Sequence, residues 1–323
     1  MDFMLSIGTI GLLWIAIVWV LRMFHVSNIN EKHVLITGCD TGFGNMLAKR
    51  LDKRGFAVIA ACLHKQSLEE LTSSCSKRLC AVQMDIREKE DIQRTFELVK
   101  QRLPPGRGLW ALVNNAGVAG AYVPFDWMNQ EEWNRVLQVN FFGLVNMTTI
   151  FAPLIKKEKG RVVNVSSITG RIAISGCGYS TSKFAVEGFT DCLRVQLRNF
   201  GVTTCLIEPG FFKTKLMDGI AAQREYIWQN LPDNIKAEYG QQYYEKTVKS
   251  VQASTDRIKE ERSSMVVDAM EHSVSCWWPK SRYVVGWEAW FFFRILSFFP
   301  AGLTDIIMII LFSQPAPAPS RKG

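Results

Sequence analysis

Tyr179 and Lys183 lie four residues apart, and Ser167 precedes the tyrosine by twelve residues. Side chains at positions i and i+4 of a helix share one face, so this spacing predicts an ammonium group beside a phenol. A nearby positive charge lowers the pKa of a phenol, which at about 10 is otherwise a poor general base at neutral pH. The three residues predict a site that moves a proton, with Tyr179, Lys183 and Ser167 as catalytic candidates.

A glycine-rich turn at residues 37–44 follows a short apolar run and precedes a helical pattern. A strand, a glycine turn and a helix N-terminus together offer backbone N–H groups and a positive dipole to a pyrophosphate. The alternative is a tight turn without a ligand, because turns use glycine freely. The position of the turn in the first strand–helix unit favours a dinucleotide site. Its candidate cofactor-binding residues are Thr37, Gly38, Asp40, Thr41, Gly42, Phe43 and Gly44.

Two later strand ends add polar residues at the edge of the sheet where the glycine turn is expected. Asp85 closes the third strand, where its carboxylate could accept a hydrogen bond from an adenine amino group or cap the next helix. Asn114, Ala116 and Gly117 end the fourth strand. Side-chain amides there can bond neighbouring strands and keep a crevice open, whereas an ordinary Asn-rich turn is the alternative. All four residues are candidates for cofactor binding.

These candidates need a scaffold, and short apolar runs that alternate with helical patterns indicate one. That alternation predicts an α/β domain at residues 30–285, a Rossmann-type, doubly wound, seven-stranded parallel sheet with helices on both faces. The expected strands are 33–37, 57–62, 80–84, 109–113, 161–166, 202–207 and 282–285, and the helices between them include 44–54, 67–75, 89–102, 131–157 and 178–199.

Composition narrows the classes of partner. The formal net charge is +8, but basic residues are scattered among acidic ones and no recognition-helix or zinc-finger pattern appears, so nucleic acid is not an expected partner. An anionic cofactor or an anionic lipid surface accounts for the charge equally well. The eight cysteines form no CxxC pair and several lie in apolar patterns. We therefore expect free thiols and predict neither a disulfide framework nor a metal site.

The N-terminal segment is apolar. Residues 3–21 carry no charge, and at about 1.5 Å per helical residue they match the thickness of a bilayer core. We expect residues 1–24 to be a transmembrane anchor. A cleaved signal peptide is the alternative, but the leader holds Asp2 and no basic residue, and no small-x-small cleavage site follows. Basic residues after the segment favour a cytosolic domain.

The C-terminal region is also apolar, but Arg294, Pro300 and Asp305 interrupt it. The interruptions argue against a plain second span at residues 286–313. An element at the membrane interface and a helix packed on the core or on a dimer mate both remain open. Residues 314–323 contain three prolines and are expected to be a disordered tail.

Taken together, the motifs resemble the short-chain dehydrogenase/reductase family. The chain shows TGxxxGxG at 37–44, NNAG at 114–117, a helix asparagine at Asn140, the Ser-Tyr-Lys set, and a Pro-Gly pair at Pro209 and Gly210. The resemblance covers about residues 30–285 and implies hydride transfer with a nicotinamide cofactor. In the family the tyrosine exchanges a proton with the substrate oxygen, the lysine lowers its pKa and binds the nicotinamide ribose, and the serine bonds the same substrate oxygen.

The resemblance also suggests roles for neighbouring residues. Asn140 would hold a proton-relay water near Lys183, although a buried Asn that bonds a backbone carbonyl is compatible with that position. Ser166 and Ser167 point to opposite faces if they lie on a strand, and the family places its catalytic serine second in such a pair. A further segment of the family packs along the nicotinamide, and its counterparts here are Pro209, Gly210 and Thr214.

The cofactor preference depends on charge near the adenosine ribose. A 2′-phosphate needs a cationic partner, and the turn instead holds Asp40 and Thr41, so NAD is favoured over NADP. The end of the second strand lacks an acidic residue to bind the ribose diol. Lys65 lies just beyond it and could accept the phosphate, or it could be a solvated lysine at a helix start.

The expected substrate is lipophilic. Aromatic residues and Met are frequent in residues 211–260, which we expect to be a lid, with Phe211 and Phe212 as substrate-binding residues beside Ser167. TGCDTGFG at 37–44 and IEPGFFKT at 207–214 are similar to the retinol and 3α-hydroxysteroid (17β-hydroxysteroid) dehydrogenase branch. That resemblance implies oxidation of retinol or a 3α-/17β-hydroxysteroid at the endoplasmic reticulum (microsomal) membrane, by a homodimer joined through helices 131–157 and 178–199. An NADPH-dependent carbonyl reductase and a catalytically silent dinucleotide-binding scaffold are the alternatives.

Overall fold

The computed structural model describes residues 2–174, 176–212, 214–256 and 263–312. Its centre is a seven-stranded sheet in the order β3-β2-β1-β4-β5-β6-β7, in which every paired strand is parallel. The predicted doubly wound parallel sheet is therefore confirmed. The strands are β1 (His33–Thr37), β2 (Ala57–Cys62), β3 (Cys80–Gln83), β4 (Ala111–Asn114), β5 (Arg161–Val165), β6 (Thr203–Pro209) and β7 (Arg282–Val285).

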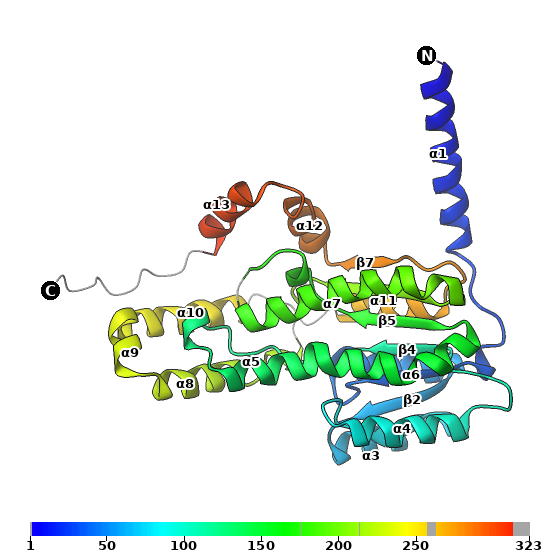
Figure 1. Ribbon diagram of the computed structural model, residues 1–323, viewed down its shortest axis with the longest axis horizontal. Helices are drawn as coiled ribbons and strands as arrows, with labels where there is room; N and C mark the ends of the chain where they lie inside the picture. Colours follow the sequence, from blue (N-terminus) through cyan, green and yellow to red (C-terminus); the bar gives the residue numbers. More distant parts are fainter. Residues whose placement is uncertain (1, 175, 213, 257–262, 313–323) are drawn as a thin grey trace.

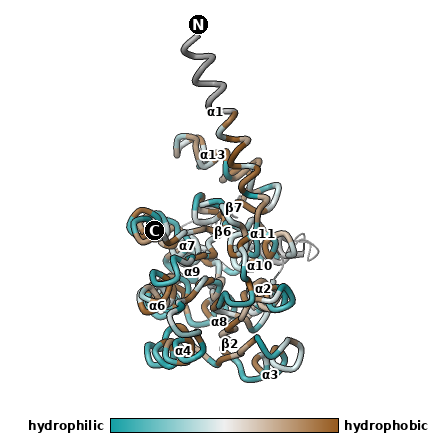
Figure 2. Tube along the Cα trace, turned by 90° about the vertical axis from the view of Figure 1, so that its right-hand side faces the viewer, coloured by the Kyte–Doolittle hydropathy of each residue, from teal (hydrophilic) through white to brown (hydrophobic). Residues whose placement is uncertain are grey.

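Two helical layers cover the sheet, one on each face, as Figure 2 shows. One layer contains α2 (Gly42–Arg54), α3 (Lys65–Ser74) and α11 (Ser263–Ser275), and the other contains α4 (Lys89–Arg102), α6 (Leu144–Glu158) and α7 (Cys177–Gln196). Alternate residues of each strand serve the two layers: Val34 and Ile36 pack toward the first and Leu35 toward the second. Burial on both faces explains why the strands are continuous apolar runs.

The predicted helix 131–157 is not uniform. It consists of α5 (Gln130–Leu137), a π-helical turn η3 (Gln138–Gly143) and α6. A Cβ at Gly143 would approach the Ile86 side chain to 2.7 Å, so glycine permits the turn to pack beneath β3. The fourth strand also starts later than the predicted residue 109, because the N–H of Leu109 donates to Leu154 of α6 instead of joining the sheet.

Three helices form a separate layer beyond the carboxyl end of the sheet (Figure 1). They are α8 (Ile220–Asn230), α9 (Asp233–Tyr239) and α10 (Gln241–Asp256), and they lie in the region predicted as a lid. Trp127 and Trp228 pack against each other with ring centroids 5.0 Å apart, and Trp228 stacks on Tyr244. These aromatic side chains give the layer an apolar core of its own.

The terminal elements lie outside the two helical layers. α1 (Asp2–Leu21) projects from the domain, and η8 (Ala289–Phe293), α12 (Arg294–Leu296) and α13 (Ala301–Leu311) follow β7 on the same side of the molecule (Figure 1). Backbone hydrogen bonds tie the chain after α1 to the end of α11, from Val26 to Ser275 and from Trp277 to Phe24, each 2.8 Å. The expected tail 314–323 lies outside the described residues.

Among the described helices, the run Gln130–Glu158 is long and apolar enough to cross a membrane. It nevertheless packs on the sheet as a core helix. Length and apolar composition of the described residues do not identify the N-terminal span expected at residues 3–21, although α1 is helical over 20 residues. The eight cysteines are free, four of them fully buried.

Candidate active site

A cavity of about 990 Å³ lies at the carboxyl ends of the strands, where parallel sheets bind ligands. The glycine turn, the ends of β3, β4, β5 and β6, helix α7, the lid and the end of α13 all contribute to its wall. Most of the predicted site residues line it: Gly38, Asp40, Thr41, Gly42, Phe43, Asp85, Ala116, Gly117, Ser167, Tyr179, Lys183, Pro209, Gly210, Phe211, Phe212 and Thr214.

The glycine turn brings the backbone close to the cavity. Gly38 has a φ of +69°, and a Cβ there would approach the Cα of Ala116 to 2.7 Å. Only glycine therefore fits between β1 and the loop after β4. Helix α2 begins at Gly42, and its N-cap residue, Thr41, makes no capping bond through its side chain. The first N–H groups of α2 and its positive dipole end are thus available to an anionic ligand in the cavity.

Three predicted cofactor residues, Thr37, Gly44 and Asn114, do not line the cavity. The hydroxyl of Thr37 instead accepts hydrogen bonds from the N–H groups of Asn115 and Ala116, both 3.0 Å. Asn114 donates to Asn164 of β5 at 2.8 Å, and that bond cross-links two strands. These residues hold the site's backbone because their side chains are buried in the sheet. The neighbouring Asn115 of the same NNAG motif does line the cavity.

Asp40 and Asp85 lie near the ends of different strands and have different hydrogen-bond partners. The carboxylate of Asp40 accepts bonds from the N–H groups of Leu63 and His64, both 2.9 Å, which places its negative charge at the carboxyl end of β2. The end of β2 itself carries no acidic residue, so the glycine turn supplies the carboxylate there. Asp85 is bonded by the guanidinium of Arg87, whose Nη2 lies 2.6 Å away and keeps the pKa of Asp85 below its usual value. The helix-cap alternative for Asp85 is wrong, because Glu88 is the N-cap of α4.

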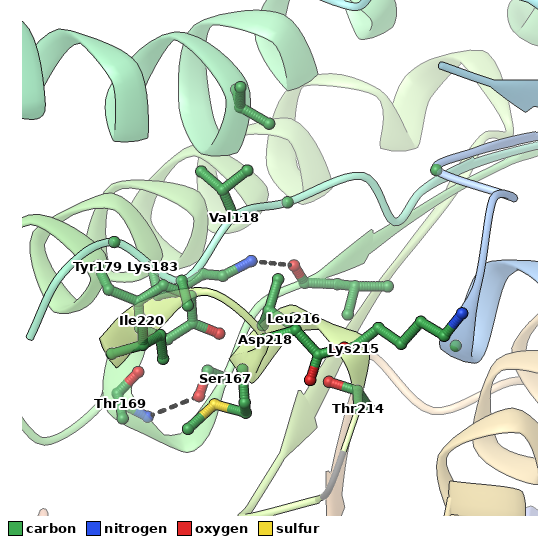
Figure 3. A pocket seen from close by; sticks show the side chains of 18 of the residues that line it. Val118, Ser167, Thr169, Tyr179, Lys183, Thr214, Lys215, Leu216, Asp218 and Ile220 are labelled. Atoms are coloured by element: carbon green, nitrogen blue, oxygen red, sulfur yellow. Dashed lines mark hydrogen bonds between the residues drawn. The ribbon is translucent and has the colours of Figure 1, made fainter. Parts of the chain in front are cut away.

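The catalytic candidates come from β5 and α7 and meet inside the cavity (Figure 3). Helix α7 presents Tyr179 and Lys183 on one face, and both are buried. The ammonium of Lys183 donates to the carbonyl of Val165 at 3.0 Å and lies 5.6 Å from the centre of the Tyr179 ring. The hydroxyl of Ser166 donates a hydrogen bond to the backbone carbonyl of Lys183, whereas the hydroxyl of Ser167 points toward the Tyr179 side chain. The two serines therefore point in different directions, and Ser167 is the one directed to the tyrosine.

Burial shifts the pKa values of Tyr179 and Lys183. It raises the pKa of Tyr179 to about 12, and the Ser167 hydroxyl acts in the opposite direction. It lowers the pKa of Lys183 to about 8, while the nearby charge of Glu187 raises it. The expected lowering of the tyrosine's pKa by lysine is absent, because desolvation penalises both charged forms and the ammonium bonds a carbonyl.

Asn140 lies in the π-helical turn and is buried behind the cavity wall. Its amide pairs with the backbone of Val118, accepting from the N–H at 2.8 Å and donating to the carbonyl at 2.9 Å. A Cβ at Gly117 would lie 3.3 Å from the Asn140 oxygen and 3.8 Å from the Lys183 nitrogen. The amide and the ammonium therefore flank the same glycine. π-Helical turns occur frequently at functional sites.

The substrate side of the cavity contains two features that the sequence analysis missed. Tyr122 adopts a φ of +49°, rare for a residue with a side chain, and its ring lies 6.0 Å from that of Tyr179. Arg224 of α8 is buried at 3% exposure and lines the same cavity. The burial of Arg224 could have been predicted from its spacing, because it shares a helix face with the buried Ile220, Ile227 and Trp228.

A cluster of charged side chains supports the floor of the site beneath α7. Arg282 of β7 pairs with Glu187, Glu208 and Asp191, and Arg171 pairs with Glu208 at 3.0 Å. Burial and the charge of Glu208 raise the pKa of Glu187 to about 7. This network fixes Glu187, the residue one turn beyond Lys183.

Comparison with known proteins agrees with these features. Residues 32–225 match the family model of short chain dehydrogenases. The chain is 42% identical to dehydrogenase/reductase SDR family member 9 of Bos taurus, covering 89% of this chain and 90% of that protein. It is 40% identical to 17-beta-hydroxysteroid dehydrogenase type 6 of Mus musculus (95% and 100% covered) and to retinol dehydrogenase 16 of Rattus norvegicus (93% and 95% covered).

Solved structures show the same fold. A short-chain dehydrogenase from Streptomyces avermitilis superposes with a TM-score of 0.66 at 23% identity, covering 87% of this chain and 94% of that one. A short chain dehydrogenase/reductase from Burkholderia phymatum, in complex with NAD, gives 0.66 at 20% identity, covering 91% and 100%. Together with the match over residues 32–225, these likenesses confirm the resemblance. The chain belongs to the short-chain dehydrogenase family and is an oxidoreductase of that family.

Proposed function

We propose that this protein is a membrane-anchored, NAD-dependent dehydrogenase that oxidises the hydroxyl of a lipophilic alcohol, retinol or a 3α- or 17β-hydroxysteroid. One observation carries the proposal: a single cavity contains the glycine turn, the Tyr179 and Ser167 hydroxyls and the apolar side chains of the lid. The names of the 17-beta-hydroxysteroid and retinol dehydrogenase relatives support the substrate class.

The cofactor would bind along the glycine turn, with its pyrophosphate at the N-terminus of α2. When bound, the nicotinamide accepts the hydride that leaves the carbinol carbon. The residues that fit this group are those of the turn together with Lys183, whose ammonium reaches the cavity, and Pro209, Gly210 and Thr214. Asp40 supports NAD, because its carboxylate at the end of β2 would repel a 2′-phosphate.

The chain's own residues handle the proton. Ser167 and Tyr179 bind the substrate oxygen, and the deprotonated Tyr179 takes the hydroxyl proton as the carbon loses hydride. Lys183 lies on the same helix face, with its ammonium 5.6 Å from the centre of the Tyr179 ring. Asn140 positions the loop at Val118 through its paired hydrogen bonds and keeps Gly117 next to the ammonium.

One observation favours a second candidate, an NADPH-dependent carbonyl reductase. With its pKa raised to about 12, Tyr179 is protonated at neutral pH and suits donation of a proton to a carbonyl oxygen. Arg87 and Lys215 also line the cavity and offer positive charge to a phosphate. Asp40 opposes this candidate, and its position at the end of β2 makes oxidation with NAD the primary proposal.

Membrane attachment would deliver the substrate. Exposed apolar side chains cover the terminal elements, including Trp14 and Trp19 of α1 and Ile309 and Ile310 of α13. Both views place α1 and α13 on the same side of the molecule, and the part of α1 that Figure 2 colours is hydrophobic. Leu311 and Phe312 line the cavity. We propose that residues 1–24 anchor the protein in the endoplasmic reticulum membrane, with the domain in the cytosol and residues 286–312 at the lipid surface beside the cavity.

Homodimerisation belongs to the same proposal. The helices that the family resemblance implicates, α6 and α7, present exposed aromatic side chains near their start, Phe142 in η3 and Phe184 in α7. Light scattering of detergent-solubilised protein tests this part. A monomer mass at micromolar concentration would contradict it.

The principal experiment uses the full chain in lipid nanodiscs. NAD⁺ and NADP⁺ are each supplied with retinol, a 3α-hydroxysteroid and a 17β-hydroxysteroid, and the reduced cofactor is followed by absorbance. We expect turnover with NAD⁺ and its loss, by at least about 100-fold, in Tyr179→Phe, because removal of a general acid–base group costs about that much. NAD⁺ binding by that variant, measured by calorimetry, should persist. Turnover that is unchanged in Tyr179→Phe excludes the proposed proton path.

A further inference from the structure

Arg224 is a buried cation that the proposed mechanism does not use. It belongs to α8 in the lid, is 3% exposed and lines the cavity. Its Nε and Nη1 atoms are buried without a hydrogen-bond partner, and no ion pair to Arg224 occurs among the described residues. Buried guanidinium groups are normally paired, because an unpartnered charge in the interior is unfavourable. The Nε and Nη1 donors of Arg224 therefore lack an acceptor.

Other polar side chains near Arg224 already have partners. Gln223 donates to Glu132 at 2.6 Å, and Glu132 also binds Arg135. Glu225 accepts a hydrogen bond from Tyr244. The titratable groups that act on Arg224 are the phenols of Tyr243 and Tyr244, and burial lowers its pKa. No carboxylate of the described lid residues is thus directed to this guanidinium.

The position of Arg224 relative to the catalytic group follows from α8. Ile220 lies beside Tyr179 and Ser167 in Figure 3. Arg224 is four residues later, on the same face of the helix, and a helix rises about 1.5 Å per residue. Ile220 and Arg224 therefore lie one helical turn apart on the side of α8 that lines the cavity. Leu216, Met217 and Ile220 give the lid an apolar part of the cavity wall, and Gln223, Thr247 and Ser250 line the same cavity as Arg224.

We propose that Arg224 determines substrate specificity by binding an anionic group, a carboxylate or a sulfate, at the end of the lipophilic alcohol remote from the reacting hydroxyl. The inference rests on the proposed function and narrows its substrate class to amphipathic alcohols that carry one such anion. A guanidinium matches the planar, oxygen-rich carboxylate and sulfate groups, and such charge-assisted hydrogen bonds are strong when buried. A bound anion would supply the acceptors that Arg224 lacks.

Lithocholate and its methyl ester form a matched pair of probes, because both carry the 3α-hydroxyl and only the acid has the carboxylate. We compare kcat/KM for the two with NAD⁺ in the wild type, Arg224→Gln and Arg224→Lys. We expect the wild type to prefer the acid by about tenfold, corresponding to about 1.4 kcal/mol. The ratio should fall to about unity in Arg224→Gln and take an intermediate value in Arg224→Lys, which keeps the charge without the planar donors.

Arg135→Gln is the control, because Arg135 lines the same cavity and is paired with Glu132. Its acid-to-ester ratio should stay within about twofold of the wild type, since a paired cation contributes little to further binding. A wild-type preference for the ester, or a ratio that Arg224→Gln does not change, overturns the proposal. A fall in NADP⁺ affinity with an unchanged ratio also overturns it, because the anion would then be a cofactor phosphate.

A binding measurement separates this inference from the proposed reaction. Lithocholate should raise the melting temperature of the wild type in the presence of NAD⁺ more than that of Arg224→Gln, whether or not turnover occurs. If neither steroid is oxidised but the shift depends on Arg224, the anion site stands and the proposed function fails. If the ester is oxidised and the shift is the same in both proteins, the proposed function stands and the anion site fails. Arg224→Met should fold, because it removes an unpaired buried charge.

Discussion

The ammonium nitrogen of Lys183 donates a hydrogen bond to the carbonyl oxygen of Val165, 3.0 Å away, and therefore turns toward the end of β5. Burial lowers the pKa of Lys183 to about 8, whereas the charge of Glu187, one turn later in α7, raises it. The lysine thus bonds a strand carbonyl and lies near the charge of a carboxylate that Arg282 binds. Its charge at physiological pH depends on its burial and on the charge of Glu187.

The direction of the reaction should depend on pH. The pKa of Tyr179 is raised to about 12, so the phenolate fraction increases by up to about tenfold for each unit of pH below that value. We expect kcat/KM for alcohol oxidation to rise steadily between pH 6 and 9, while carbonyl reduction, which uses the protonated phenol, does not rise. Initial rates in both directions check this. An oxidation rate that is level over the range would contradict the raised pKa.

Lys183 should make stability depend on pH in a defined window. Its pKa in the folded protein, about 8, is below the ordinary lysine value of 10.5. Between these values the unfolded chain binds more protons, so the free energy of unfolding rises as pH increases from 8 to 10.5, by at most about 3 kcal/mol. Urea unfolding of Lys183→Met should lack this rise, whereas the exposed-lysine variant Lys157→Met should retain it. Equal slopes in all three proteins would rule out the depressed pKa.

Gly38→Ala should weaken both folding and cofactor binding. The methyl group would meet the backbone of Ala116 at 2.7 Å at a φ of +69°. We expect a destabilisation of about 1–3 kcal/mol and weaker NAD⁺ binding, by about tenfold or more. Gly188→Ala is the control, since no atom lies within 4 Å of its Cβ and alanine is favoured over glycine at this exposed position of α7. Thermal unfolding and calorimetric titration measure both effects.

Asp40→Asn should reduce the preference for NAD⁺ over NADP⁺. The amide keeps the size of the side chain but removes the charge that lies at the end of β2. We expect the ratio of the two dissociation constants to shift toward NADP⁺ by about tenfold, as one repulsive charge is removed. Titration of each cofactor gives the ratio directly. A wild-type protein that already binds NADP⁺ more tightly would refute the assigned preference.

Much of the fold is predictable from local pattern. The strands His33–Thr37 and Ala57–Cys62 match their predicted bounds, because parallel strands buried on both faces are continuous apolar runs between glycine and polar breaks. The bounds of α4, Lys89–Arg102, also agree. The interrupted helix at Gln138–Gly143 escaped prediction, because hydrophobic periodicity does not distinguish one extra residue in a turn.

The candidate site was predicted as a set of motifs, but its internal arrangement depends on tertiary contacts. Thr37 and Asn114 belong to the expected motifs, yet their side chains bond backbone and strand neighbours. The acidity of Tyr179 was misjudged because burial is a property of the folded chain. Arg224 was passed over because an arginine in a helix is usually solvated, and its unpaired burial appears only when α10 packs against α8.

The π-helical turn Gln138–Gly143 changes the phase of the helix that contains it. A π turn holds one residue more than an α turn, so the residues after it are rotated by about 100° relative to an uninterrupted helix. Before the turn, Glu132 reaches Gln223 of the lid; after it, Met147 and Phe151 pack into the sheet. The continuous helix formed by α5, η3 and α6 can therefore contact the lid in one direction and the sheet in another. Removing a single residue from the turn would leave the helix intact and direct one of those faces to solvent.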